Sequence, residues 1–176
     1  TGAGFCRMPA GLRVARAALH HWEEPPISGK NGAGTVFFSG CTLRCSYCQN
    51  GDISAGGRGR DITPERLREI YFELLGQGAH NIELVTPTHF LPWILPSLEP
   101  KLPVPVVYNC GGYERVEMLR LLEGRVQIYL PDLKYALEKP ARELSCAGDY
   151  FPVAAAAIDE MLRQVGPYVI GEDGLM

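Results

Sequence analysis

The sequence lacks an excess of basic residues and lacks any long apolar run. Its 176 residues include 17 Lys and Arg against 20 Asp and Glu, so the formal net charge is -3. No basic field favours nucleic acid or an anionic membrane, and we expect neither as a partner. No apolar stretch approaches the roughly 20 residues that a membrane-spanning helix needs, so we also expect no transmembrane segment.

Two further motifs are missing. Gly32 and Gly34 are not followed by the Lys-Ser/Thr pair of a phosphate-binding loop. The visible start at Thr1 shows no apolar segment typical of a secretory signal, although the chain begins without Met. A chain of 176 residues can bury one good core, so we expect a single domain or a piece of one.

Cysteine is present, but its distribution does not favour disulfides. Three of the six cysteines fall within residues 41–48, and a chain of this size can build a core without cross-links. A tight, odd-numbered cluster is more typical of a metal or redox site in a reducing compartment. We therefore expect a cytoplasmic protein.

Apolar segments and turn residues predict strands that alternate with helices. We expect strands at 35–39, 81–86, 104–109 and 126–130. We expect helices from Thr63-Pro64 to about Gly76, and at 90–98, 113–123 and 150–165. Residues 1–28 form a loop-rich lead-in that allows a short edge strand at 12–17, and 51–60 form an exposed connection.

This alternation predicts parallel βαβ units and an α/β fold. Four or so units do not close a parallel barrel, and an open barrel leaves its sheet edges bare. The alternatives are a small open α/β sheet and the front part of a longer barrel, and we favour the second. We expect a partial TIM-like (βα) barrel with about four to five units over residues 29–176, preceded by the lead-in 1–28.

The most informative stretch is the cysteine loop, residues 41–48, with Cys41, Cys45 and Cys48 spaced C-x3-C-x2-C directly after a predicted strand. Thiolates select zinc or iron-sulfur clusters. Structural zinc usually takes four ligands from paired motifs, and the sequence has no second C-x2-C. A zinc site stays open because other residues could supply a fourth ligand: Cys6, Cys110, Cys146, His20, His21, His80 or His89. Three cysteines on an iron-sulfur cube leave one iron for another ligand.

Polar residues follow each predicted parallel strand. Ligands of such folds gather at the carboxyl ends of the strands. The four segments at these ends are 40–50, 86–89, 109–112 and 131–134, and they carry thiols, hydroxyls, an amide, a carboxylate and an amine. We expect these groups to share one rim.

The cysteine loop resembles the signature of the radical S-adenosylmethionine (SAM) enzymes, with Tyr47 directly before the last cysteine. Residues 34–41 together with Cys48-Gln49-Asn50 are similar to the pyruvate formate-lyase activating enzyme group. Segments 81–89, 108–114 and 129–135 look like the branch described as related to that activase. The resemblance extends from about Gly4 to Gly166 and implies a partial barrel of the radical SAM type.

The resemblance implies that Cys41, Cys45 and Cys48 hold a 4Fe-4S cluster whose open iron is chelated by S-adenosylmethionine. Reductive cleavage would give methionine and a 5'-deoxyadenosyl radical that abstracts a hydrogen atom, as expected of an activating-enzyme-like oxidoreductase. In the activases the hydrogen comes from a glycine of a partner enzyme. The implied partners are thus a glycyl-radical enzyme, or another protein or peptide substrate, and reduced flavodoxin or ferredoxin as electron donor.

Seven further residues become candidate cofactor ligands through the resemblance. Tyr47 and Asn50 would lie near the adenine, and Asp132 and Lys134 near the methionyl end, where an ammonium can pair with a carboxylate. Two segments depart from the family pattern. Thr86-Pro87-Thr88-His89 replaces a Gly-Gly-Glu segment, which leaves Thr86 and Thr88 as candidates, and Asn109 replaces an Asp.

Simpler interpretations stay open beside these. Asp132 and Lys134 could form an ordinary salt bridge, and Thr86, Thr88 and Asn109 could be turn residues. Cys6 stays a candidate member of a second metal site. The alternatives to a glycyl-radical activase are a radical SAM enzyme acting on a small molecule or peptide, and a non-catalytic iron-sulfur or zinc protein.

Overall fold

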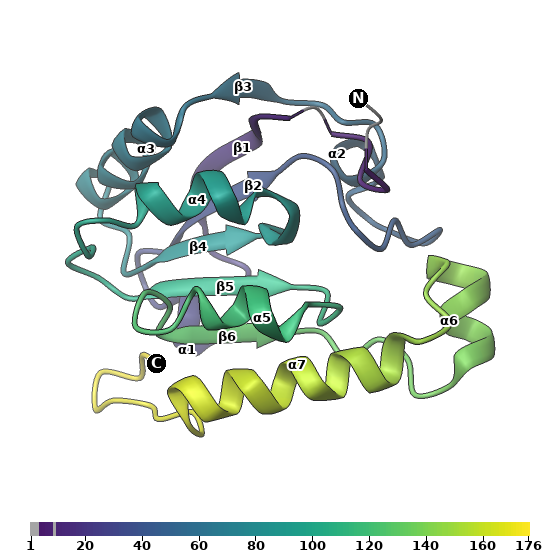
Figure 1. The fold of residues 1–176 in the computed structure, drawn as a ribbon. Coiled ribbons are helices and arrows are strands. Elements are labelled where there is room, and N and C mark those ends of the chain that lie inside the picture. The colour runs from purple at the N-terminus through teal and green to yellow at the C-terminus, as the bar shows by residue number, and fades with distance from the viewer. Residues whose placement is uncertain (1–3, 9) are drawn as a thin grey trace.

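The computed structural model describes residues 4–8 and 10–176 (Figure 1). Within them, six strands form one sheet in the order β3-β1-β2-β4-β5-β6. The strands are β1 (Leu12–His20), β2 (Ala33–Phe38), β3 (Arg60–Ile62), β4 (Ile82–Val85), β5 (Val106–Cys110) and β6 (Ile128–Pro131). Strands β2, β4, β5 and β6 run parallel, whereas β1 is antiparallel to both β2 and β3. The sheet does not close on itself, as expected of a partial barrel.

Four helices cover one face of this sheet (Figure 1). They are α3 (Pro64–Gly76), α4 (Leu91–Ser97), α5 (Val116–Arg120) and α7 (Tyr150–Val165). Apolar side chains from both layers form the main core, including Val36, Leu84, Leu119 and Met161. The remaining helical elements are α1 (Pro25–Ser28), α2 (Gly51–Ser54), the 3-10 turn η1 (Thr88–Phe90) and α6 (Glu138–Ser145). The predicted α/β architecture of parallel strands joined by helices is confirmed.

Two helices begin and end as predicted. The hydroxyl of Thr63 accepts a hydrogen bond from Arg66 N at 3.2 Å, which caps α3 at its expected start. Helix α7 covers the predicted range 150–165. Helix α5 is shorter than the predicted 113–123, because the turn after β5 continues to Arg115, the N-cap residue.

The N-terminal strand corrects one prediction. An edge strand was expected at 12–17, but β1 spans Leu12–His20 and lies between β3 and β2. The missing neighbour is β3, which begins at Arg60, the last residue of the predicted connection 51–60. Its pairing is supported across the strands by Arg13, whose Nε lies 2.6 Å from Asp61 Oδ1. Because β3 is held by an ion pair and is mostly exposed, its three residues show no apolar pattern that would predict a strand.

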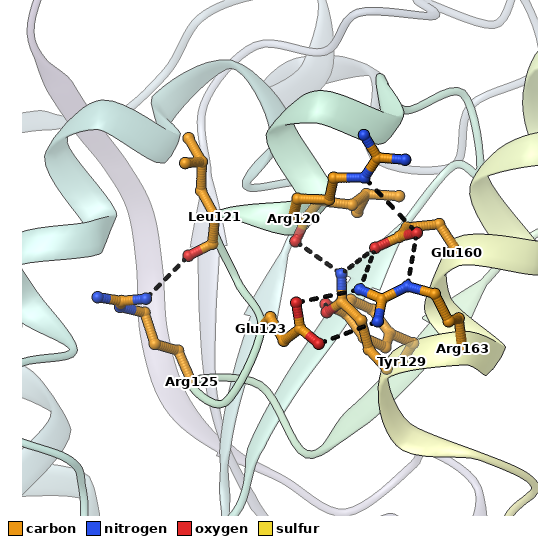
Figure 2. Close-up of polar contacts among 9 residues, drawn as sticks. Arg120, Leu121, Glu123, Arg125, Tyr129, Glu160 and Arg163 are labelled. Atoms are coloured by element: carbon orange, nitrogen blue, oxygen red, sulfur yellow. Dashed lines mark hydrogen bonds and ion pairs between the residues drawn. The ribbon is translucent and has the colours of Figure 1, made fainter.

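A polar network joins α7 to α5 and β6 (Figure 2). We define the α5–α7 polar network as Arg120, Glu123, Tyr129, Glu160, Arg163 and Gln164. The guanidinium of Arg163 contacts both oxygens of Glu123 at 3.0 Å and also contacts Glu160, at 2.7 and 3.0 Å. Gln164 donates to the carbonyl of Leu119 at 3.0 Å and accepts from Tyr129 at 2.7 Å. These contacts fix α7 against the sheet layer.

No helix in the described part of the chain is both long and apolar enough to cross a bilayer. The division between a lead-in 1–28 and a barrel domain 29–176 stays a prediction. Residues 1–3 and 9 of that lead-in lie outside the described residues.

Candidate functional site

One cavity lies at the carboxyl ends of the parallel strands. Its volume is about 770 Å³, within the usual range for ligand pockets. The register brings Phe37, Val85, Asn109 and Leu130 level with one another across β2, β4, β5 and β6, and all four line the cavity. The cavity is also lined by every predicted site residue: Cys41, Cys45, Cys48, Tyr47, Asn50, Thr86, Thr88, Asn109, Asp132 and Lys134. The structure thus brings all ten together.

The turn that starts the cysteine loop requires glycine. Gly40 has φ +81°, and a Cβ there would overlap the side chain of Met8 and lie 3.1 Å from His89 Nε2. The Gly40 N–H donates to the carbonyl of Ile53 at 3.0 Å, which ties the turn to α2. This tight exit from β2 directs the following residues along the cavity wall.

The three loop thiols are half-buried and free. Each sulfur accepts a hydrogen bond: Cys41 from Leu43 N at 3.4 Å, Cys45 from Ser145 Oγ at 2.9 Å, and Cys48 from Ser54 Oγ at 3.3 Å. Burial raises the pKa of Cys41, although backbone N–H groups of the loop act in the opposite direction. Hydrogen bonds of this kind orient and stabilise thiolate ligands.

The three thiols line one cavity. Among the described residues, no group of three His, Cys, Asp or Glu side chains is arranged to hold a single metal ion. Structural zinc takes four ligands around one ion, whereas in an iron-sulfur cluster the cysteines bind different irons.

Some of the other cysteines and histidines line the cavity and others lie outside it. Cys110 and His20 line the cavity as well. His89 lies beside the Gly40 turn, where its Nε2 is 2.7 Å from the carbonyl of Ser39 and burial lowers its pKa. Cys146 is exposed, and Cys6 packs against the main core, so neither joins the lining.

Asp132 and Lys134 form an ion pair. Lys134 Nζ lies 2.5 Å from Asp132 Oδ2, and the Lys134 backbone N–H donates to Tyr150 OH at 2.9 Å. Burial is the largest single influence and lowers the pKa of Lys134, but the hydrogen bond and the charge of Asp132, together with nearby Cys45 and Tyr150, outweigh it, so the pKa is raised. Both side chains line the cavity, so the pair presents opposite charges to a ligand.

Thr88 and Asn109 are engaged with two buried glutamates. Thr88 Oγ1 donates to Glu114 Oε1 at 2.5 Å, and Asn109 Nδ2 donates to Glu83 Oε1 at 2.8 Å. Thr86 has φ +57°, and its backbone N–H donates to the carbonyl of Asn109 at 2.9 Å. The segments that depart from the family pattern therefore form a hydrogen-bonded floor of the cavity.

Sequence analysis did not single out three acids of the cavity lining, Glu23, Glu24 and Glu114, and two of them have raised pKa values. Burial raises the pKa of Glu114 to about 7, although Thr88, Tyr108 and Cys110 hydrogen-bond to the carboxyl and act in the opposite direction. Burial, with repulsion from Glu83 and other acids, raises the pKa of Glu23 to about 7 as well. Glu114 lies two residues after Gly111-Gly112, which follow β5, so its position near a strand end could have suggested a site residue. Glu23 lies in a loop where no sequence pattern points to the cavity.

Comparisons with known proteins agree with the cysteine motif. The family model described as Radical SAM superfamily matches residues 35–167. An uncharacterized protein of Methanocaldococcus jannaschii is 31% identical over 163 residues, which is 87% of this chain and 47% of that protein. The pyruvate formate-lyase-activating enzyme of Clostridium pasteurianum is 37% identical over 67 residues, 34% of this chain and 28% of that protein. The chain thus spans less than half the length of these relatives.

Proposed function

Because the chain belongs to the radical SAM superfamily, we propose that its cavity binds a 4Fe-4S cluster and S-adenosylmethionine and serves a radical enzyme. Members of this superfamily use both cofactors, so the resemblance inferred from the cysteine loop is confirmed at this level. In our proposal Cys41, Cys45 and Cys48 hold the cluster. When bound, it supplies the electron that splits S-adenosylmethionine into methionine and a 5'-deoxyadenosyl radical, which abstracts hydrogen from the substrate.

The protein's own residues bind and orient the cofactors. Lys134 can pair with the methionyl carboxylate, and Asp132 can accept from its amine. Tyr47 and Asn50 flank the adenine, and Thr86, Thr88 and Asn109 offer hydroxyl and amide groups from the floor. Apolar lining residues such as Leu43 and Ile53 help to exclude water from the reacting groups.

One observation carries this proposal: the ten candidate residues come from separate post-strand segments and line a single cavity of about 770 Å³. The fold alone does not require these ten residues to line the same cavity, because a loop after a strand can also turn its side chains toward solvent. It supports a common ligand for the thiols, the floor residues and the Asp132–Lys134 pair.

The substrate is a finer proposal. Activation of a glycyl-radical enzyme, with reduced flavodoxin or ferredoxin as electron donor, is supported by the partial match to the Clostridium pasteurianum activating enzyme. The alternative is a small-molecule or peptide substrate. It is supported by Thr86, Thr88 and Asn109, which are neutral where the activase pattern carries acidic residues. A cytoplasmic location remains the prediction from cysteine use.

Anaerobic reconstitution with iron and sulfide tests the cofactor proposal. We expect a brown protein that, with dithionite and S-adenosylmethionine, releases 5'-deoxyadenosine. Cys41→Ala should abolish cluster binding, whereas Cys146→Ala, at an exposed thiol outside the cavity, should retain it. A colourless, zinc-loaded protein, or equal behaviour of the two variants, would contradict the assignment.

Isotope transfer tests the substrate proposal. A candidate glycyl-radical partner carrying deuterated glycine is incubated with the reconstituted protein, and deuterium is sought in 5'-deoxyadenosine by mass spectrometry. Deuterium transfer supports the activase function. Release of unlabelled 5'-deoxyadenosine with that partner, together with label transfer from a small molecule, supports the alternative.

A further inference from the structure

The end of α6 holds the cysteine loop through two consecutive residues. Ser145 Oγ lies 2.9 Å from Cys45 Sγ, and the backbone N–H of Ser46 donates to the carbonyl of Leu144 at 2.8 Å. Figure 1 shows α6 beside this loop, far along the chain from it. The sulfur contact is shorter than those of Cys41 and Cys48, at 3.4 and 3.3 Å. Cys45 is therefore the most closely supported of the three thiols.

The Ser145 hydroxyl is itself the last member of a chain of hydroxyl groups. Tyr135 OH lies 2.6 Å from Ser145 Oγ, and Tyr47 OH lies 2.6 Å from Tyr135 OH. We call Tyr47, Tyr135 and Ser145 the hydroxyl relay. Ser145 and Tyr135 are 2% and 7% exposed, so water does not compete with the contacts at the sulfur end.

Counting hydrogens fixes the direction of this relay. A metal-bound thiolate carries no hydrogen and can only accept, so the single hydrogen of Ser145 must point to Cys45 Sγ. Ser145 Oγ then accepts from Tyr135, and Tyr135 accepts from Tyr47, since each hydroxyl has one hydrogen. All three O–H bonds are thus oriented toward the sulfur, and in a buried setting such bonds polarise one another.

A compact apolar cluster holds the relay in place. Leu43, Ala141, Ala147 and Tyr150 pack with Tyr135, and the rings of Tyr135 and Tyr150 meet edge to face with centroids 5.2 Å apart. Because these residues come from the cysteine loop, α6 and α7, the Tyr135 ring and the Ser145 side chain cannot shift without disturbing the packing. The packing therefore holds the three hydroxyl groups within hydrogen-bond distance of one another.

Resting on the proposed function, we propose that Ser145 is a positioning residue for the Cys45 ligand and that the hydroxyl relay raises the reduction potential of the cluster. A donated hydrogen bond stabilises negative charge on the sulfur, and this charge is greater after one-electron reduction. Removing the donor should therefore make the cluster harder to reduce. The O–H bonds stay intact, and only an electron is transferred.

The test is an anaerobic redox titration of the reconstituted protein, with dithionite supplying the electron and electron paramagnetic resonance following the reduced cluster. Ser145→Ala should lower the equilibrium constant for reduction roughly tenfold, or about 59 mV for a one-electron couple. Tyr135→Phe keeps the Ser145 donor but removes its polarising neighbour, so we expect a smaller shift of the same sign.

Ser28→Ala is the matched control. Ser28 is equally buried, its hydroxyl has no hydrogen-bond partner among the described residues, and it belongs to α1 outside the cavity lining. We expect wild-type potential for this variant. Resonance Raman frequencies of the iron-thiolate stretch should change in Ser145→Ala and stay unchanged in Ser28→Ala.

The possible outcomes separate this inference from the proposed function. A cluster in Ser145→Ala with the potential of Ser28→Ala overturns the relay while the proposed function stands. If Ser145→Ala fails to hold a cluster, Tyr135→Phe decides: a wild-type potential there overturns the relay, and a lowered potential supports it. A wild-type protein that takes up no iron-sulfur cluster overturns both.

Discussion

Glu160 and Glu114 are buried to nearly the same degree, at 6% and 3% exposure, yet the molecule holds them in opposite ways. Glu160 belongs to the α5–α7 polar network, where Arg163 and Gln164 hydrogen-bond to it and lower its pKa to about 2. Glu114 lies in the cavity wall, where burial raises its pKa to about 7 against hydrogen bonds from uncharged groups.

The difference separates a carboxylate that stays ionised and links two helices from one whose protonation changes near neutral pH. Paired with a guanidinium, Glu160 keeps its charge down to a pH of about 2, so it acts as a fixed link between helices. Held only by hydroxyls and a thiol, Glu114 exchanges its proton near neutral pH. Perturbed carboxyls of the second kind are typical of functional sites rather than of structural links.

The largest expected effect compares two glycines, one in each region. Gly112, in the turn beside Glu114, has φ +74°, and a Cβ there would overlap the carbonyl oxygen of Asp132. Gly124, beside the α5–α7 network, has φ +76° and no neighbouring atom within 4 Å of its Cβ position. We expect Gly124→Ala to cost about 1 kcal/mol from backbone conformation alone, and Gly112→Ala about 3 kcal/mol or more.

Urea unfolding of both variants checks this prediction, with S-adenosylmethionine binding by calorimetry as a second measurement. Gly112→Ala should also weaken binding, because Asp132 must move. Equal losses of stability in the two variants would show that the turn at Gly112 tolerates displacement of the rim.

Next in size is the pH dependence contributed by Glu114. Its carboxyl keeps a proton to about pH 7 when folded but loses it near its ordinary pKa of 4.5 when unfolded. Between these values the folded state binds more protons, so the free energy of unfolding falls as pH rises, by about 3 kcal/mol in total. Glu114→Gln should remove this contribution, leaving that of Glu23, whose pKa burial also raises to about 7.

Urea unfolding at pH 5 and pH 8 measures the slope, with Glu160→Gln as the control. The pKa of Glu160 is lowered to about 2, so its contribution is present above pH 4.5 and is lost only as pH falls toward 2. An unchanged slope between pH 5 and 8 in Glu114→Gln would mean that Glu114 is ionised throughout.

A smaller effect is expected in the α5–α7 network itself. Arg163→Met leaves Glu160 with only Gln164 and the more distant Arg120, 3.9 Å away, so the midpoint of thermal unfolding should fall by a few degrees. Arg66→Met is the matched control, because Arg66 pairs with exposed glutamates on the outer face of α3. Calorimetry should detect a shift in the first variant and none in the second.

The smallest effect is expected at the residue shared by both regions. Tyr129 lines the cavity, and its hydroxyl donates to Gln164 in the network. Tyr129→Phe should cost about 1 kcal/mol through the lost hydrogen bond, measured by urea unfolding against the exposed control Tyr168→Phe. The pH slope attributed to Glu114 should stay unchanged; a changed slope would show that the two regions are coupled.

The cavity lining was predictable from sequence because its signals are local. The cysteine spacing is readable within eight residues, and parallel strands bring their carboxyl ends to one edge whatever joins them. Thus Thr86, Asn109 and Asp132 could be assigned to one rim before their contacts were known. The residue types at strand ends carried that information.

The supports of the site could not be predicted, because they depend on contacts between distant segments. Only Ala141 and Ser145 of α6 are buried, so this short polar helix has no apolar repeat to reveal it. Strand β3 is recognisable only from its partner β1. Ser145 reaches Cys45, and Thr88 reaches Glu114, through packing that no local pattern encodes.

The contact between Ser145 and Cys45 joins residues 100 positions apart, and this separation has a consequence during synthesis. A ribosome adds roughly 5–20 residues per second, so about 5–20 s pass between the emergence of the thiols and the arrival of α6. During that interval the cysteine loop has neither its hydroxyl donor nor the backbone contact at Ser46. Oxygen and competing metals can thus reach the thiols before the pocket is complete. The separation of Cys45 and Ser145 along the chain sets the length of this exposure.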